Sequence, residues 1–96
     1  MSAVQHTPGP WRVGPVDDTR VEDASGNEVA QIDGDYNHPD TWPLMEANAR
    51  LIAAAPEMLA ALKAVDALGM LNPTGSGAVE DAARAVKAAI AKAEAR

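Results

Sequence analysis

Hydrophobic and polar positions alternate along the first third of the chain, a pattern typical of β-strands. Short alternating runs occur at residues 11–13, 20–23 and 28–32. The last two runs are separated by Ala24-Ser25-Gly26-Asn27, whose residue types favour a turn. The pattern predicts a three-stranded antiparallel β-meander over residues 11–33, and one face of such a short sheet needs a cover of helices.

Two segments that contain proline flank the predicted sheet. Residues 1–10 are predicted to be a flexible N-terminal segment, and it ends in Thr7-Pro8-Gly9-Pro10. Its prolines fix φ and make a stiff entry into the first strand. Residues 33–41 have no apolar period and contain Gly34 and Pro39, so they are predicted to form a connecting loop.

The apolar spacing then becomes helical, and residues 43–95 predict two to three α-helices packed on the sheet. The run from Leu44 to Ala54 consists mostly of good helix formers. Pro56 interrupts this pattern, and because a proline inside a helix costs about 3 kcal/mol, we expect a break or a sharp kink there. Gly69 ends the next helix, and a turn-rich segment at 72–77 precedes the last one.

Two apolar stripes follow from this helical spacing. If the kink at Pro56 is mild, one stripe continues across it. The last helix repeats apolar residues with 4-3-4-3 spacing, which suits close helix packing on the sheet or in self-association. The first stripe comprises Leu51, Ala55, Met58, Leu59, Leu62 and Val65, and the second comprises Val79, Ala83, Val86, Ile90 and Ala93.

Composition limits the hydrophobic core. The 96 residues suffice for one small α+β domain that spans residues 1–96. Hydrophobic residues make up 47% of the chain, but 21 residues are alanine, which buries little area. A core this thin predicts that the helices bury further apolar surface against copies of the chain or against a partner.

The net charge of −6 disfavours binding to a DNA or RNA polymer. The residues before Thr41 contain two arginines and eight acidic residues, whereas the remainder contains six of each sign. The chain has no cysteine, no start that resembles a signal peptide and no apolar run of membrane-spanning length. These features predict a cytoplasmic protein that does not contact a membrane.

The sequence lacks the patterns of the common catalytic and cofactor sites. No glycine-rich phosphate-binding motif occurs, and the Asp33-Gly34-Asp35 cluster lacks the spacing of a calcium loop. His6 and His38 lie in segments flanked by proline, where we interpret them as solvated loop residues rather than as bases or ligands. We therefore predict a protein without enzymatic activity, cofactor or metal.

Six residues are candidates for ligand recognition. Trp11 and Arg12 are neighbours on the first strand, so their side chains point to opposite faces of the sheet. We interpret Trp11 first as the main packing residue between sheet and helices, and second as a platform on which a planar ligand stacks. The full set comprises Trp11, Arg12, Tyr36, Trp42, Asn48 and Arg50.

Asn48 and Arg50 are the strongly polar residues of an otherwise apolar stretch of the first helical run. Arg50 can pair with Glu46 one turn earlier, and Asn48 can hold the preceding loop. Alternatively, the amide reads a base edge and the guanidinium binds phosphate. Tyr36 and Trp42 bracket that loop, and they either anchor it on the core or form a lid over a ligand.

The chain resembles a widespread family of small phage and prophage proteins. The resemblance rests on Thr7-Pro8-Gly9-Pro10-Trp11, on the Val-Glu-Asp-Ala-Ser-Gly-Asn-Glu-Val-Ala hairpin, and on Ala-Asn-Ala-Arg-Leu-Ile-Ala-Ala-Ala-Pro-Glu at residues 47–57. It spans about residues 7–63, whereas the last helix carries no signature.

Small phage proteins of this size and make-up are similar to anti-defence sponges, which bind cyclic nucleotide messengers of CBASS-type bacterial immunity without cleaving them. The resemblance implies a homo-oligomer, a dimer or tetramer, in the host cytoplasm, with non-catalytic pockets for a cyclic di- or oligonucleotide between protomers. From residue chemistry, we assign base stacking to Trp11, phosphate binding to Arg50 and base-edge recognition to Asn48, while Arg12 or Arg20 adds positive charge.

A protein-binding inhibitor or adaptor is the alternative function. The acidic hairpin would mimic nucleic acid or dock on a basic surface of a host protein, and the helices would serve to dimerise the chain. The excess of acidic residues before Thr41 favours this alternative.

Overall fold

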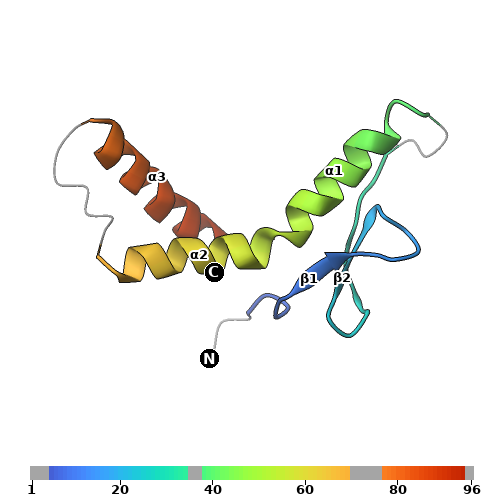
Figure 1. The fold of residues 1–96 in the computed structure, drawn as a ribbon, viewed down its shortest axis with the longest axis horizontal. Helices are drawn as coiled ribbons and strands as arrows, with labels where there is room; N and C mark the ends of the chain where they lie inside the picture. The colour runs from blue at the N-terminus through green and yellow to red at the C-terminus, as the bar shows by residue number, and fades with distance from the viewer. Residues whose placement is uncertain (1–4, 35–37, 70–76, 95–96) are drawn as a thin grey trace. The chain divides into compact units, whose positions relative to one another are not determined.

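The computed structural model describes residues 5–34, 38–69 and 77–94, which form three strands and three helices (Figure 1). The predicted α+β class, with a three-stranded antiparallel sheet followed by helices, is confirmed. The elements are β1 (Trp11–Val13), β2 (Arg20–Asp23), β3 (Glu28–Gln31), α1 (Trp42–Ala53), α2 (Ala55–Ala67) and α3 (Ala78–Ala93).

The chain divides into two compact units. Residues 5–57 contain the sheet, α1 and the first turn of α2, and we call them the sheet unit. The helical unit begins at residue 58 and contains the rest of α2 and all of α3. The organisation of residues 1–96 as a single domain stays a prediction.

The sheet has the order β1-β2-β3, and both strand pairs are antiparallel. Val13 lies opposite Val21 on the side that is buried. The turn between β2 and β3 is fixed by Asp23, whose Oδ1 accepts hydrogen bonds from the backbone N–H groups of Ser25 and Asn27, both at 2.9 Å. Gly26 has a φ of 86°, a conformation that favours glycine, which explains why this sequence turns here.

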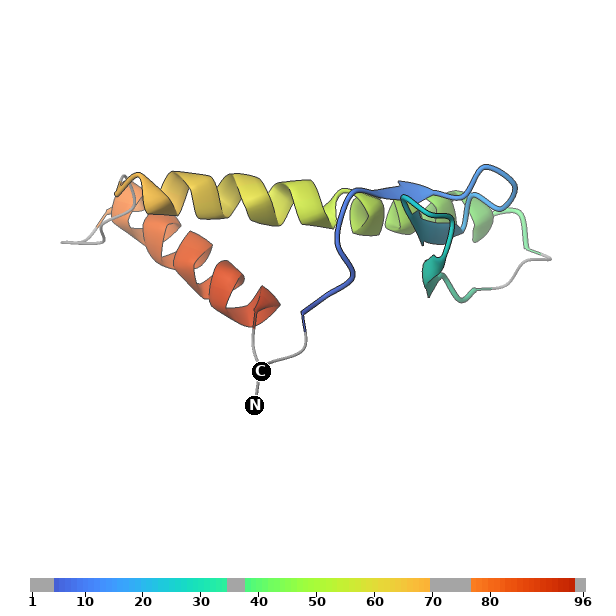
Figure 2. The ribbon, with the colours of Figure 1, turned by 90° about the horizontal axis from the view of Figure 1, so that it is seen from below.

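Helix α1 covers one face of the sheet (Figure 2). Val21 of the sheet and Ala49 of the helix are fully buried, and Ala53 completes this contact. Since alanine side chains are small, the helix backbone lies close to the strands. The half-buried residues around this centre are Trp11, Val13, Val29, Ala30, Ile32 and Ile52.

The segment after β3 also packs closely on α1. The Met45 side chain is almost fully buried. A Cβ atom placed on Gly34 would lie 2.5 Å from the Met45 Sδ atom. The backbone at Gly34 therefore fills the space that any larger residue would need, and this contact closes the core beside the sheet.

The predicted break at Pro56 is confirmed. Helix α1 ends at Ala53, Ala54 lies in a turn, and Pro56 occupies the first turn of α2, where its missing N–H is tolerated. The single apolar stripe that a mild kink would allow is not formed, because Leu51 is exposed while Leu59 is half-buried.

Residues 5–10 contact the rest of the sheet unit at two places. The Trp11 Nε1–H group donates a hydrogen bond to the Thr7 carbonyl oxygen at 3.1 Å. A Cβ atom on Gly9 would lie 2.8 Å from the Pro56 Cβ atom, so the backbone passes directly against the first turn of α2.

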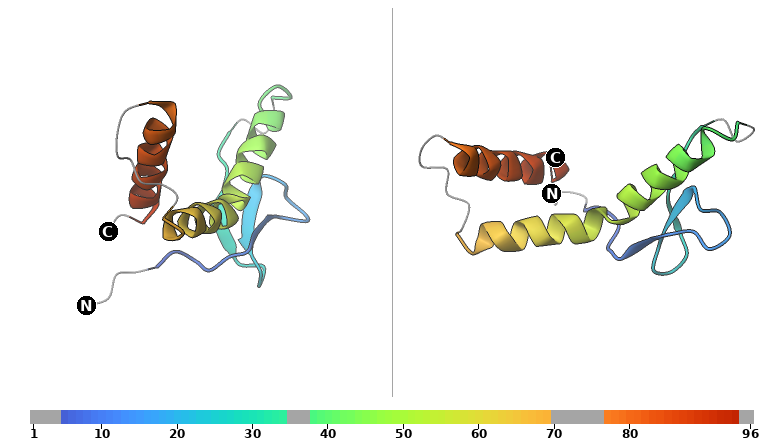
Figure 3. Two further views of the ribbon diagram at one scale, coloured as in Figure 1. Left: turned by 60° about the vertical axis from the view of Figure 1, so that its left-hand side comes forward. Right: turned by 45° about the horizontal axis from the view of Figure 1, so that its top comes forward.

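In the helical unit, α2 and α3 run in opposite directions (Figure 3). Two ion pairs join them: Lys63 Nζ lies 2.9 Å from Glu94 Oε2, and Lys87 pairs with Asp66. Of the residues described in this unit, only Ala83 is buried. None of the helices described is long and apolar enough to cross a membrane.

Candidate functional site

Trp11 lies between the sheet and α1, where it is half-buried and packs against the core. Its indole N–H is already bonded to the Thr7 carbonyl. The His6 ring meets the indole edge to face, with 6.1 Å between ring centroids and an interplanar angle of 87°. These contacts give Trp11 the packing role that we predicted first. Its use as a stacking platform stays a prediction.

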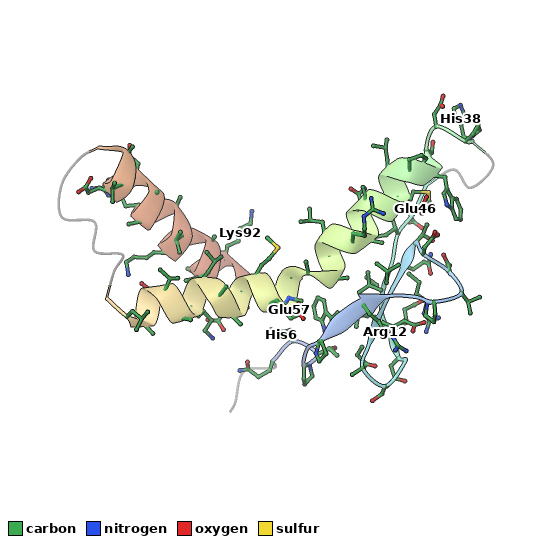
Figure 4. All side chains as sticks on the ribbon, viewed as in Figure 1. His6, Arg12, His38, Glu46, Glu57 and Lys92 are labelled. Carbon is green, nitrogen blue, oxygen red and sulfur yellow. The ribbon has the colours of Figure 1, made fainter. Side chains whose placement is uncertain are left out.

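Arg12, labelled in Figure 4, lies on the opposite face of β1. Its side chain belongs to a row of alternating charges. Arg12 Nη2 lies 3.5 Å from Glu22 Oε1, and Arg20 Nε lies 2.9 Å from Glu22 Oε2. Arg20 also reaches Glu28, with 3.5 Å between Nη1 and Oε1. Both arginines are therefore paired with carboxylates of the sheet itself.

Asn48 and Arg50 lie on the exposed side of α1. Two residues along a helix correspond to a rotation of about 200°, so the side chains flank an exposed strip that contains Leu44 and Leu51. Among the residues that the structure describes, neither side chain forms a hydrogen bond or an ion pair.

The remaining two candidates flank the loop before α1. Trp42 is the first residue of α1 and is half-buried, and the helical repeat puts it on the face that carries Met45 and Ala49. Tyr36 lies outside the described residues. The structure thus places Trp11 on the inner side of α1 and both Asn48 and Arg50 on its outer side, so one protomer does not bring these three together.

The structure also pairs two carboxyl groups that lie 28 positions apart in the sequence, Asp18 in the loop after β1 and Glu46 on α1. The main reason why the pKa of Glu46 is raised is the hydrogen bond that its protonated carboxyl group donates to the Asp18 carboxylate, and burial and the negative charge of Asp18 act in the same direction. Arg50 opposes this rise. No local motif marks this pair, so sequence inspection missed it.

Two other carboxylates of the sheet unit are held in the ionised form. The Asp17 Oδ1 atom accepts hydrogen bonds from the Thr19 hydroxyl at 2.6 Å and the Thr19 backbone N–H at 3.0 Å, which lowers the pKa of Asp17. The backbone N–H of Asn27, with smaller help from Ser25, lowers the pKa of Asp23. Asp17 and Asp23 therefore keep their negative charge to a lower pH than an ordinary aspartate does.

The contacts of both histidines are with residues close to them in the sequence. His38 is exposed, and its Nδ1 atom accepts a hydrogen bond from the Asp40 backbone N–H at 3.3 Å. Within the described ranges 5–34, 38–69 and 77–94, no group of three or more histidine, aspartate or glutamate side chains could hold a metal ion.

The comparison with known proteins places the chain in a phage family. The family model described as Salmonella phage P22 protein Y8K6 matches residues 1–96. No curated protein and no solved structure matched the chain. The resemblance to small phage proteins, carried by residues 7–63, is confirmed at this level. Because the match covers the whole sequence, the chain belongs to the family of Salmonella phage P22 protein Y8K6.

Proposed function

We propose that this phage protein acts without catalysis, in the host cytoplasm, by binding a basic surface of a host protein through its sheet unit. The distribution of charge carries this proposal. Residues 5–57 contain ten acidic residues against three arginines, a net charge of −7. Two of those arginines, Arg12 and Arg20, already pair with glutamates of the sheet. The unit therefore presents unbalanced negative charge that favours association with a basic partner.

The pair formed by Asp18 and Glu46 supports this proposal. Two carboxyl groups held together by different elements repel each other once both are ionised. Arg50 offsets this repulsion only in part, since the pKa of Glu46 is still raised, so a lysine or arginine of a partner would relieve it further and favour binding there. Asp17 and Asp23 add fixed negative charge at the two ends of the strands.

The experiment compares two double variants that each remove two negative charges. Asp18→Asn/Glu46→Gln changes the acidic sheet unit, and Glu80→Gln/Asp81→Asn is the matched control in α3. Each immobilised protein is exposed to host-cell lysate at low and at physiological salt, and retained proteins are identified by mass spectrometry. We expect one basic host protein to be retained by the wild type and the control, and lost by Asp18→Asn/Glu46→Gln. Equal retention by all three proteins would contradict the proposal.

Sequestration of a cyclic nucleotide immune messenger is the second candidate function, and the exposed side chains of Asn48 and Arg50 favour it. Because Trp11 lies on the other side of α1, a pocket with all three residues would need at least two protomers. Nanomolar binding corresponds to about −12 kcal/mol, which also exceeds what one arginine and one amide supply.

Titration calorimetry with cyclic di- and trinucleotides and with cyclic ADP-ribose isomers tests this second function. A sponge should bind one of them tightly, release it intact after denaturation and lose binding in Arg50→Ala. A partner-binding protein should show no heat with any of these ligands, and it should retain its protein partner in Arg50→Ala.

A further inference from the structure

Helix α2 carries an apolar stripe that the protomer leaves open to solvent. Met58 is 50% exposed, Val65 39% and Leu68 74%. Ala61 lies between them and is exposed as well. These four residues follow one another with 3-4-3 spacing, so they share one face at the end of α2. We call Met58, Ala61, Val65 and Leu68 the outer stripe.

The outer stripe contains no charge to keep it solvated. Between Met58 and Leu68 the charged residues are Lys63 and Asp66. Both already pair with α3, Lys63 with Glu94 and Asp66 with Lys87. All other residues of this stretch are apolar, and a helix that is apolar on more than one face is normally buried in an assembly.

The helical unit also lacks an interior of its own. Leu59 and Leu62 are half-buried, and Ala83 is its one buried side chain among the described residues. Two short helices with so little buried area do not hold together by helix propensity, since helical stability in proteins comes mainly from packing. A further layer against α2 would supply the missing burial.

We infer that the outer stripe binds the outer stripe of a second copy of this chain. The net charges of the two units favour association through the helical units rather than through the sheet units. The helical unit has five basic and four acidic residues, a net charge of +1, whereas the sheet unit has −7. Two copies that met through their sheet units would repel each other strongly, but two helical units meet with almost no net charge.

The order of residues in the stripe is complementary to itself in an antiparallel arrangement. Met58 of one copy then lies opposite Leu68 of the other, and Ala61 lies opposite Val65. In the middle of the interface, Val65 of each copy faces the smaller Ala61 of the other. At each end, Met58 packs against Leu68. A two-fold axis repeats every contact, which is the usual geometry of a homodimer. This association is independent of partner binding by the acidic sheet unit.

Sedimentation velocity on the full chain tests the interface. Val65→Glu introduces a charge into the outer stripe at a position that is exposed in the protomer, so the fold tolerates it. The matched control is Leu51→Glu on α1, where the leucine is 62% exposed. We expect the wild type and Leu51→Glu to sediment at twice the mass of the chain, and Val65→Glu at once that mass, with the tryptophan fluorescence of a folded sheet unit unchanged. A monomeric wild type, or a dimeric Val65→Glu protein, would overturn the inference.

Site-directed cross-linking tests the antiparallel register, because the chain has no cysteine of its own. Ala61→Cys and Val65→Cys proteins are mixed and oxidised at low concentration. We expect disulfides between the two different variants to exceed the disulfides formed by either variant alone by about tenfold, because residues 61 and 65 face each other across the axis and their Cβ atoms then approach disulfide distance. Preferential linkage of Ala61→Cys to itself would overturn the antiparallel arrangement.

Discussion

The sheet unit and the helical unit differ in how they remove apolar surface from water. In the sheet unit, strands and α1 enclose Val21, Met45 and Ala49 from two sides. In the helical unit, α2 and α3 are joined by two ion pairs at their surface and bury little besides Ala83. The comparison teaches that secondary structure alone does not make an independent folding unit. The sheet unit supplies its own core, and we infer that the helical unit is completed by association.

Two methionines provide the largest expected difference between the units. We expect Met45→Ala to destabilise the sheet unit by about 2–5 kcal/mol, because it removes a buried side chain and leaves a cavity. Met58→Ala should leave this unit within about 0.5 kcal/mol of the wild type, since Met58 is half exposed. Both tryptophans lie in the sheet unit, so denaturation followed by tryptophan fluorescence reports on it alone. If Met45→Ala and Met58→Ala shifted the denaturation midpoint equally, the two units would not differ in how they bury apolar surface.

Substitutions of two glycines, one in each unit, should have effects of intermediate size on stability. Gly34→Ala should destabilise the sheet unit by about 1–3 kcal/mol, because the new methyl group would overlap the buried Met45 side chain. Gly69 has a φ of 73°, and no atom of the described residues lies within 4 Å of an added Cβ, so Gly69→Ala strains the end of α2 without overpacking against them. The fluorescence transition should move for Gly34→Ala only, whereas far-ultraviolet circular dichroism should detect the loss of helix in Gly69→Ala.

A smaller effect is expected at the ion pair between α2 and α3. Lys63→Ala should change the free energy of unfolding by about 0.2–1 kcal/mol, because the pair is solvent-exposed and screened by salt. Lys92→Ala, which removes a charge of the same sign from the same unit, serves as control. A loss of several kcal/mol in Lys63→Ala would show that the two helices depend on this pair rather than on association.

The smallest effects concern pH, and they have opposite signs for two carboxyl groups of the sheet unit. The pKa of Asp23 is lowered, so its contribution to stability is present above the ordinary value of 3.8 and is lost as the pH falls through its lower folded value. The pKa of Glu46 is raised, so its contribution is present at low pH and is lost as the pH rises through its higher folded value. Glu46→Gln should therefore increase stability at neutral pH, and Asp23→Asn should decrease it. Urea denaturation at pH 3 and pH 7 measures both differences.

Local sequence signals accounted for most of the elements. The strand at Trp11, the turn at Gly26, the break at Pro56 and the end of α2 at Gly69 were all predicted from residues with strong backbone preferences. The face of α1 that is buried against the sheet was not predicted. Its alanines have helix propensity but no distinctive polarity, so nothing local separates buried Ala49 from exposed Ala47.

The candidate site was harder to predict because it depends on pairing between distant residues. Arg12 stood out as a cation, yet the register of β1 and β2 places Glu22 beside it. Asp18 and Glu46 come together only once α1 packs beside the loop after β1. Sequence inspection identified charged residues, and the fold decided which of them were already paired.

The contact between Gly9 and Pro56 has a consequence for the evolution of the family. These two residues belong to the two stretches that carried the resemblance, at the N-terminal segment and at the start of α2. Since a methyl group on residue 9 would collide with the proline ring, a relative with a larger residue at position 9 must accommodate it at position 56. We therefore expect residues 9 and 56 to vary together among relatives, although they lie far apart in the sequence.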